Sequence, residues 1–367
     1  MIKGSDMSSV LEIEQAGGNY YHHGIKKDPL LILKDCGFNL IRLRIWNDPY
    51  DEEGNPYGAG NCDLETVKAL SKRCKQYGLK ILLNFHYSDF WADPGKQFVP
   101  KAWENYNLKQ LEKAVYVFTY QTLAELKKEN LQPDIVAIGN EITNGFLWPI
   151  GKVDNFSNLV TLLNAGIKAC RDILLSAKIM LHLDNGGNNQ LYVNWFDKYF
   201  LNGGLDFDYI GLSYYMFWHG TLEDLKNNLN DLANRYNKEM IVAETSYGFT
   251  MEDYDEYEEL EERTGMILNQ KLIECLPFEI SKQGQCEYIK TLMKLIDSID
   301  KDLCKGFIYW GAESIPVNGC GWANQTALKY INENGPGGNS WANQALFDYD
   351  GNALPILETI KDYNFKK

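Results

Sequence analysis

The stretch Asp134-Ile-Val-Ala-Ile-Gly-Asn-Glu-Ile-Thr-Asn-Gly145 decides how the rest of the chain is interpreted. Four apolar residues at positions 135–138 precede Gly139, Asn140 and Glu141, and Pro133 keeps a helix from running into them. Such a short apolar run is typical of a strand buried on both faces, as in a parallel sheet. The run ends in an amide and an acid, and in a (β/α)8 barrel catalytic side chains gather at that end of a strand. Glu141 is therefore the first candidate for a catalytic residue.

Strand and helix alternate along all 367 residues. The expected strands are Ile2–Met7, Phe38–Trp46, Leu79–His86, the run at 135–138, Lys178–Asp184, Phe207–Tyr215, Met240–Glu244 and Lys305–Trp310. The expected helices are Asp28–Cys36, Asp63–Tyr77, Leu108–Lys128, Asn158–Leu175, Asn189–Phe200, Thr221–Tyr236, Glu287–Ser298 and Asn352–Asp362. Eight strands favour a closed α/β (β/α)8 TIM barrel over an open doubly wound sheet, which usually has fewer. Since no linker or change in composition interrupts the pattern, we expect a single catalytic domain over residues 1–367.

The charge balance narrows the classes of partner. A net charge of -14 argues against nucleic acid and anionic membranes, because nothing here would neutralise phosphates. No apolar run is long enough to span a bilayer, and the first residues have no signal-peptide core. Of the possible partners, a neutral substrate is most compatible with this net charge. The 23 Tyr and 9 Trp exceed the needs of a core, which fits a carbohydrate cleft but also a merely Tyr-rich fold.

The eight cysteines are scattered without any C-x-x-C pair. This spacing predicts neither a zinc site nor a redox motif. Several lie in apolar or helical stretches, so we expect free buried thiols that pack as small hydrophobes.

A second acid, Glu244, also follows an apolar run at the end of an expected strand. In the strand order above, Glu141 belongs to the fourth strand and Glu244 to the seventh, so their side chains can converge across the barrel mouth. Retaining glycoside hydrolysis requires two carboxyl groups about 5–5.5 Å apart, one as acid/base and one as nucleophile. Repulsion between them would keep Glu141 protonated while Glu244 is ionised. The alternative is that each acid is a salt-bridged rim residue.

Polar neighbours extend this candidate site. Asn140 is expected to donate to the sugar 2-hydroxyl. Arg42 and Arg44, on one side of their strand, would hold a carboxylate ionised, unless they only close an ion pair inside the barrel.

The remaining candidates for substrate binding are mostly aromatic and lie at strand ends or in loops. His86 and the pair Tyr214 and Tyr215 end strands and would orient the nucleophile, or serve only as hydrogen-bonded scaffold. Trp310 ends the last strand and is a candidate floor for the sugar at the cleavage point. The other candidates are Trp46, Asp89, Trp91 and Trp341.

Five motifs in order give the sequence a resemblance to a known family. They are Arg42-Leu-Arg-Ile-Trp-Asn-Asp-Pro49, Phe85-His-Tyr-Ser-Asp-Phe-Trp-Ala-Asp-Pro-Gly-Lys-Gln97, Ile138-Gly-Asn-Glu-Ile-Thr143, Gly211-Leu-Ser-Tyr-Tyr215 and Trp341-Ala-Asn-Gln-Ala-Leu-Phe-Asp348. The chain resembles glycoside hydrolase family 53, the (arabinogalactan) endo-β-1,4-galactanases of clan A. The resemblance implies a retaining barrel enzyme that cuts β-1,4-galactan, the pectin side chain. It also implies Glu141 as acid/base and Glu244 as nucleophile.

Two departures from the family pattern bear on charge and metals. Asn84 stands where the family usually has Asp, which keeps the shape and removes a charge. Some members bind calcium in the insertion that here contains Asp253 and Asp255, but Tyr257 replaces a His. Although the loop supplies oxygens, we expect a solvated surface there, no metal site and no required cofactor.

The resemblance also sets expectations for partners and location. The partners would be galactan polysaccharide or galacto-oligosaccharides, with no nucleic acid and no membrane, and the protein would be a monomer. We expect secretion or display at the cell surface, with the signal peptide absent from this sequence, while a cytoplasmic location stays open. Two other functions stay open as well: another clan A glycosidase (mannanase, cellulase or β-galactosidase), and a galactan-binding protein without turnover.

Overall fold

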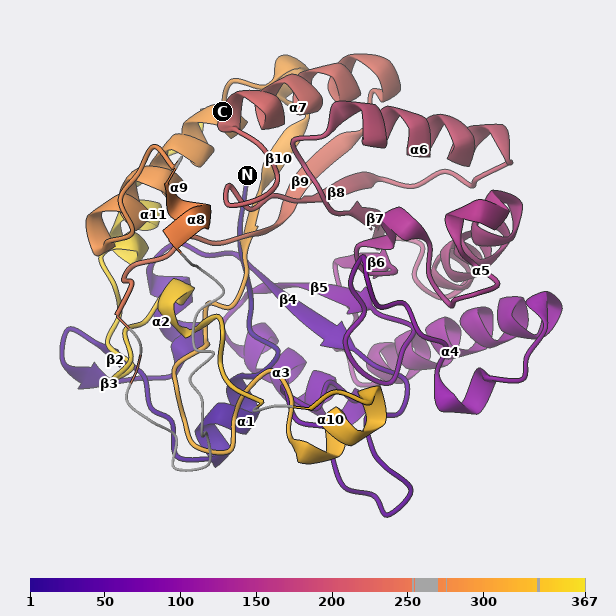
Figure 1. Cartoon of the computed structure of the whole chain (residues 1–367), viewed down its shortest axis with the longest axis horizontal. Coiled ribbons are helices and arrows are strands. Elements are labelled where there is room, and N and C mark those ends of the chain that lie inside the picture. Colours follow the sequence, from indigo (N-terminus) through magenta and orange to yellow (C-terminus); the bar gives the residue numbers. More distant parts are fainter. Residues whose placement is uncertain (253, 255–269, 275, 335–336, 367) are drawn as a thin grey trace.

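The computed structural model describes residues 1–252, 254, 270–274, 276–334 and 337–366. Eight parallel strands close into a barrel in the order β1-β10-β9-β8-β7-β6-β5-β4. They are β1 (Ile2–Asp6), β4 (Leu40–Ile45), β5 (Lys80–Phe85), β6 (Ile135–Ile138), β7 (Lys178–Leu183), β8 (Tyr209–Ser213), β9 (Glu239–Thr245) and β10 (Cys304–Tyr309). The fold is therefore the (β/α)8 TIM barrel that the alternating pattern predicted. In Figure 1 the strands occupy the middle and the helices surround them.

The barrel helices follow their strands in sequence. They are α2 (Pro29–Asp35), α3 (Leu64–Gln76), α4 (Leu108–Lys128), α5 (Phe156–Ile173), α6 (Asn189–Leu201), α7 (Leu222–Tyr236), α9 (Lys282–Ile296) and α11 (Ile356–Asp362). Shorter elements lie in the connections: α1 (Val10–Gln15), the hairpin β2 (Tyr21–His22) and β3 (Ile25–Lys26), α8 (Gln270–Ile273), α10 (Gln325–Ile331), and 3-10 turns at Lys101–Trp103, Ile142–Asn144, Val153–Asn155, Asp300–Asp302 and Ala342–Gln344. Asp63 caps α3, since its side chain accepts a hydrogen bond from the Thr66 N–H, as the sequence predicted.

Two apolar layers hold the barrel together. Small and medium side chains fill the barrel interior: Leu40, Leu82, Ile135, Ala137, Met180, Ile241, Ala243 and Ile308. The alternate residues of the same strands, such as Val136, Ile138 and Val242, pack outward against the helices. The strands are thus apolar on both faces, which explains why they appear in the sequence as unbroken apolar runs.

The predicted bounds differ from the structure where local capping or turns decide. Helix α9 begins at Lys282 rather than Glu287, because the Ser281 side chain accepts a hydrogen bond from the Gly284 N–H and caps it. Helix α11 begins at Ile356 rather than Asn352, because the Asn352 N–H donates to the Asp348 carboxylate (2.8 Å) in a preceding turn.

Among the described residues, no helix combines the length and the apolar character needed to cross a bilayer. The seven cysteines that the structure describes are all buried and unpaired, which confirms the prediction of free buried thiols for those positions. Cys275 lies outside the described residues.

Candidate active site

A cavity of about 530 Å³ opens where the strands end at their carboxyl termini. Every strand, or the loop after it, supplies at least one lining residue: Asp6 from β1, Arg44 from β4, Trp91 after β5, Glu141 after β6, Asp184 after β7, Tyr215 after β8, Glu244 from β9 and Trp310 after β10. This is the end of a TIM barrel at which catalytic groups gather. The sequence prediction of a site at this mouth, containing both acids, is consistent with the position of the cavity.

Glu141 sits on a sharply turned backbone just after β6. Its φ and ψ are 46° and 51°, in the left-handed region. A non-glycine residue there costs about 1–3 kcal/mol and persists where the surrounding structure enforces it, often at functional sites. The side chain is only 8% exposed. Burial, and next the negative charges of Glu244 and Asp184, raise the pKa of Glu141 well above the usual value of a glutamate. The surroundings of Glu141 therefore favour its protonated form.

Glu244 faces the cavity because β9 contains one extra residue. Leu212 of β8 pairs with Val242, whereas the next residue, Ser213, pairs with Glu244, so Ala243 is left without a partner in the ladder. A bulge of this kind interrupts the alternation of side chains. As a result Ala243 and Glu244 both point into the barrel, the first into the interior core and the second into the cavity.

The carboxylate of Glu244 is held by two donors. Arg42 Nη1 forms an ion pair with Oε1 at 2.7 Å, and the Tyr215 hydroxyl donates to Oε2 at 2.9 Å. Burial raises the pKa of Glu244, while the Arg42 charge and the Tyr215 hydrogen bond act in the opposite direction. Among the described residues no cation pairs with Glu141 in this way, so of the two acids Glu244 is the one whose surroundings favour the ionised form.

The two acids lie close together. One oxygen of Glu141, one oxygen of Glu244 and one ring nitrogen of His182 all lie within 4.8 Å of one another. Both ring nitrogens of His182 have partners: Nδ1 is 3.1 Å from Asn140 Oδ1, and Nε2 is 2.8 Å from Ser213 Oγ. Burial, and next the charge of Arg42, keep the pKa of His182 well below its usual range, so the ring is neutral.

Asn140 connects the polar groups at the bottom of the cavity. Its Oδ1 accepts from Arg42 Nη2 at 2.7 Å and is 2.8 Å from the Asn84 amide. Its Nδ2 donates to the Ala92 carbonyl at 2.7 Å. Arg42 thus bridges Asn140 and Glu244, and the side chain beside Glu141 is tied to the one that holds Glu244.

Aromatic rings form the walls. Five of the nine tryptophans line the cavity together with Tyr215: Trp91, Trp218, Trp310, Trp322 and Trp341. The guanidinium of Arg44 lies 4.1 Å from the Trp91 ring centre and 5.3 Å from that of Trp310. Such flat apolar surfaces beside polar groups suit the faces and hydroxyls of a sugar.

Several candidates lie behind the lining rather than in it. Arg42 is fully buried behind the cavity lining, where its partners are Glu244, Asn140 and, at 3.7 Å, Asp6. Arg44 does line the cavity but pairs with neither Glu141 nor Glu244, and its Nη2 donates to Ser9 Oγ at 2.8 Å. The Asp6 carboxylate lies 3.7 Å from Arg44 Nε.

Four further candidates do not reach the cavity lining. The Trp46 indole donates to His86 Nδ1 at 3.2 Å, which also accepts from the Ala92 N–H at 3.2 Å. Asp89 accepts backbone hydrogen bonds from Asp48 (3.0 Å) and Lys101 (2.7 Å) and so fixes loops.

Tyr214 points away from Glu244, and its hydroxyl donates to the Gly220 carbonyl at 2.9 Å. Neighbouring residues in extended chain point to opposite sides, so of the Tyr214–Tyr215 pair it is Tyr215 that reaches the Glu244 carboxylate.

Other residues of the site went unrecognised in the sequence. Asp184, at the end of β7, faces Glu141 and accepts a hydrogen bond from the Thr143 hydroxyl. Its position after an apolar strand, like that of Glu141, was a usable signal. Trp218 and Trp322 lie in loops, where a large ring has less reason to pack.

Besides Glu141, Glu244 and Asp184, three further acids line the cavity near Arg44: Asp6, Glu12 and Glu313. Burial, and next the charge of Asp6, raise the pKa of Glu313 to about 7. No short motif in the sequence links these three positions, which come from β1, α1 and the loop after β10. The loop with Asp253 and Asp255, considered as a calcium site, lies outside the described residues.

Relatives with known names share this architecture over almost the whole chain. An endo-beta-1,4-galactanase of Bacillus subtilis is 37% identical over 98% of this chain and 85% of its own length. An arabinogalactan endo-beta-1,4-galactanase of Cellvibrio japonicus is 34% identical over 98% of this chain and 90% of its own length. Among solved structures, the Ignisphaera aggregans GH53 catalytic domain superimposes with a TM-score of 0.90 at 42% identity, covering 98% of this chain and 95% of that one.

The model of the family described as glycosyl hydrolase family 53 matches residues 2–360. This match spans all eight barrel strands and both acids of the cavity. With these identities and this coverage, the chain is a glycoside hydrolase that belongs to glycosyl hydrolase family 53.

Proposed function

We propose that this glycoside hydrolase cleaves internal β-1,4-galactosidic bonds of galactan, including type I arabinogalactan side chains of pectin, with retention of configuration. Glu141 is the acid/base and Glu244 the nucleophile. The observation that carries this proposal is a pair of buried carboxyl groups with oxygens within 4.8 Å of each other, in surroundings that favour the protonated form of Glu141 and, through Arg42, the ionised form of Glu244. That spacing fits the roughly 5–5.5 Å of retaining enzymes and leaves no room for the water that inverting enzymes hold at roughly 6.5–9.5 Å.

In the first step a Glu244 oxygen attacks the anomeric carbon, and the bond from that carbon to the leaving oxygen breaks. The Glu141 proton passes to the leaving oxygen, so the released chain end is a neutral hydroxyl. Arg42 and Tyr215 hold the attacking carboxylate in place by the ion pair and hydrogen bond described above. A covalent galactosyl ester on Glu244 results, with the configuration inverted once.

In the second step the roles of Glu141 reverse. Now ionised, Glu141 removes a proton from water, whose oxygen attacks the anomeric carbon and displaces Glu244. The second inversion restores the original configuration. Trp91, Trp310 and Trp341 offer ring faces for the sugar during both steps.

The substrate assignment rests on the names of the relatives. The similar proteins of Bacillus subtilis and Cellvibrio japonicus are both named as β-1,4-galactanases, and an uncharged polysaccharide fits a chain with a net charge of -14. A polysaccharide is degraded outside the cell membrane, so we infer that the enzyme is secreted or displayed at the cell surface. We also infer that it works as a monomer. Separating medium from cells before the galactan assay, and size-exclusion chromatography with light scattering, check these two points.

One digestion experiment tests reaction, bond and stereochemistry together. Linear galactan is incubated with the enzyme, and the products are followed by chromatography and by proton NMR of the newly formed reducing end. We expect early release of mixed oligosaccharides and initial appearance of the β-anomer. Initial α-anomer would rule out double displacement, and release of galactose alone would rule out endo cleavage.

Parallel incubations with mannan and carboxymethyl-cellulose test the choice of sugar. We expect hydrolysis at least about a hundredfold slower than on galactan, because galactan is joined through the axial O4 of galactose, and chains joined through the equatorial O4 of mannose or glucose present a different shape to the subsites. Comparable rates on mannan or cellulose would move the assignment to another clan A activity.

A further inference from the structure

The hairpin β2–β3 and the closing helix α11 bring a set of metal-ligand side chains together on a surface away from the cavity. The two strands are joined by His23 and Gly24, whose φ angles are 53° and 75°. Positive φ at both central residues defines a type I′ hairpin turn. The hairpin is fixed to the chain before α11, because the Tyr21 N–H donates to the Gly351 carbonyl at 2.8 Å and the Ala353 N–H donates to the Tyr21 carbonyl at 2.8 Å.

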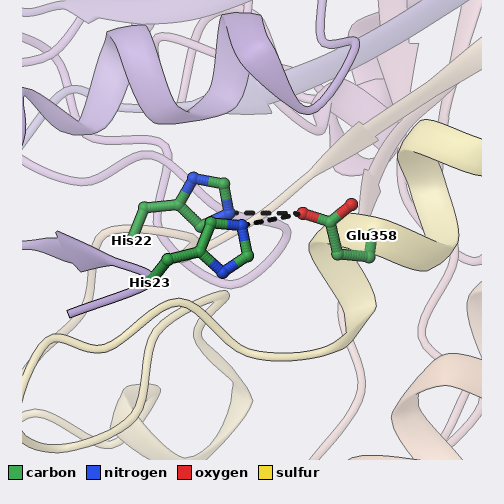
Figure 2. A group of neighbouring side chains, drawn as sticks. All are labelled: His22, His23 and Glu358. Atoms are coloured by element: carbon green, nitrogen blue, oxygen red, sulfur yellow. Dashed lines mark hydrogen bonds and ion pairs between the residues drawn. The ribbon is translucent and has the colours of Figure 1, made fainter. Parts of the chain in front are cut away.

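This turn places both imidazoles of the hairpin on one side, facing the helix. The rings of His22 and His23 stack with centres 4.0 Å apart and planes at 28°. Figure 2 shows both rings directed at one oxygen of Glu358 on α11. The distances to Glu358 Oε1 are 3.3 Å from His22 Nε2 and 3.8 Å from His23 Nε2.

We propose that His22, His23 and Glu358 bind a divalent transition-metal ion such as Zn²⁺, Co²⁺ or Ni²⁺. Their ligand atoms all lie within 4.8 Å of one another. With metal–ligand bonds of about 2.0–2.1 Å, two ligands of a tetrahedral ion lie about 3.3 Å apart. The observed separations need only small side-chain rotations to reach that spacing.

An ion pair without a metal explains the arrangement less well. An ion pair needs one ring, yet both rings direct a nitrogen at the same Glu358 oxygen while their centres stack at 4.0 Å. A metal ion takes both rings in the neutral form and supplies the positive charge that Glu358 faces. Such an ion would account both for the stacked rings and for the Glu358 oxygen that they share.

The kinds of ligand select the class of metal. Two imidazole nitrogens and one carboxylate suit zinc and its neighbours, whereas calcium and magnesium prefer oxygen ligands throughout. The thiol of Cys36 lies 4.0 Å from His22 Nε2, which adds a soft donor beside the site. The proposal departs from the expectation of a metal-free protein, but it assigns the metal no part in catalysis, because none of its three ligands lines the active-site cavity.

A bound ion would cross-link two parts of the chain that are 336 residues apart. It would tie the first hairpin to the last helix of the barrel and stabilise the native state increasingly as the free metal concentration rises above the Kd. The predicted role is therefore a structural clamp that closes the barrel between its first and last elements.

The remaining histidines of the chain are less suited to hold a metal ion. The chain has five histidines, and His86, His182 and His219 are buried. Within the part of the chain that the structure describes, only His182 of these belongs to a second cluster with metal-ligand spacing, together with Glu141 and Glu244. There both ring nitrogens of His182 are already engaged, and Glu244 is paired with Arg42.

The test uses tag-free full-length protein, stripped with chelator and titrated with zinc chloride at pH 7.5 by calorimetry and by thermal unfolding. We expect one saturable site and an unfolding midpoint that rises with zinc. His23→Asn should weaken binding about tenfold or more. Asn accepts the left-handed backbone that position 23 requires, so the turn is retained without the imidazole. Glu358→Gln is the second variant and should also weaken binding.

Two outcomes would overturn the proposal: no saturable zinc binding by the wild-type protein, or equal zinc affinity in the wild type and His23→Asn. Calcium chloride serves as the matched control ligand. Any calcium effect should be the same in the wild type and His23→Asn, and a calcium effect that depends on His23 would contradict the metal class proposed here. The unfolding midpoint of metal-free His23→Asn checks that the variant remains folded.

Discussion

Glu141 and Glu244 are the same side chain in the same cavity, yet their surroundings differ in almost every respect. Glu141 comes directly after a strand, and its backbone is in the left-handed region. Its side chain faces the negative charges of Glu244 and Asp184. Glu244 lies within a strand on extended backbone and is held by Arg42 and Tyr215. Both are almost fully buried, so the difference in proton affinity comes from the partners rather than from burial.

In the mechanism that we propose, this contrast lets one residue type serve as both proton donor and nucleophile. Where burial raises the pKa of two neighbouring acids, the one with a cation and a hydrogen-bond donor ionises first. Ionisation of Glu244 then reinforces protonation of Glu141. Five substitutions, from the largest expected effect to the smallest, test this asymmetry.

Glu244→Gln removes the attacking oxygen while keeping the shape of the side chain. We expect the kcat on galactan to fall by about 10⁴-fold or more, because no other described group is placed to form the covalent intermediate. The smaller variant Glu244→Ala leaves room for a small anion, so there azide should restore turnover and release galactosyl azide of inverted configuration. Substantial hydrolysis by Glu244→Gln without azide would show that Glu244 is not the nucleophile.

Glu141→Gln removes the proton donor and should lower the kcat on galactan by about 10²–10⁴-fold. The loss should be much smaller for the first step with a nitrophenyl glycoside, whose leaving group needs no proton. A burst of nitrophenol followed by slow turnover would report this. An equal loss on both substrates would contradict the acid/base role.

Arg42→Met removes the cation that holds Glu244. Since Arg42 lowers the pKa of Glu244, its loss raises that pKa, and the acidic limb of kcat/KM should move to higher pH. The uncompensated charge should also cost about 3–5 kcal/mol of stability, measured by urea unfolding. Arg42→Lys keeps the charge and should show a smaller shift. An unchanged acidic limb in Arg42→Met would separate Arg42 from the ionisation of Glu244.

Tyr215→Phe removes one hydrogen bond to Glu244 and leaves the ring in place. Because a hydrogen bond to a charged group is worth about 1.5–3 kcal/mol, we expect kcat/KM to fall about tenfold to a hundredfold. Tyr214→Phe is the matched control, because the Tyr214 hydroxyl bonds to a backbone carbonyl outside the cavity. Equal losses of activity in the two variants would show that the hydrogen bond to Glu244 has no special role.

Asp184→Asn tests the other side of the comparison. The negative charge of Asp184 raises the pKa of Glu141, so its removal should lower that pKa and move the basic limb of the pH profile to lower pH. Thr143→Val, which removes the hydrogen bond to Asp184 but keeps its charge, should leave the basic limb nearly unchanged. A shift of similar size in both variants would indicate a change in shape rather than in charge.

Much of the fold could be predicted from local patterns. Apolar runs such as 135–138, capping residues such as Asp63 and the alternation of eight strands with helices determined the barrel. These features are encoded within a few residues of one another, since strand burial, capping and helix termination act over short distances. The bounds of α9 and α11 were less predictable, because a cap at Ser281 and a turn at Asp348 competed with the helical pattern.

The site was predictable to the level of strand ends and no further. Glu141, Asn140, Tyr215, Trp310 and Trp341 could be placed at the mouth because each follows or ends an expected strand or belongs to a recognisable motif. Asp184 had the same signal and was overlooked. His86, Trp46, Asp89 and Tyr214 carried similar signals but turned out to support the loops around the cavity.

By itself, then, the sequence determined the barrel and the two acids, because both follow from the periodicity of single segments. The tertiary structure decided which way those acids point and which of them holds the proton. If side chains alternated strictly along β9, Glu244 would point outward as Val242 does. The extra residue in β9, which appears only when β9 is paired with β8, turns Glu244 into the cavity. The positions of Arg42, Tyr215 and Asp184 around the two carboxyls likewise depend on strands far apart in sequence, and charges interact through space rather than along the chain.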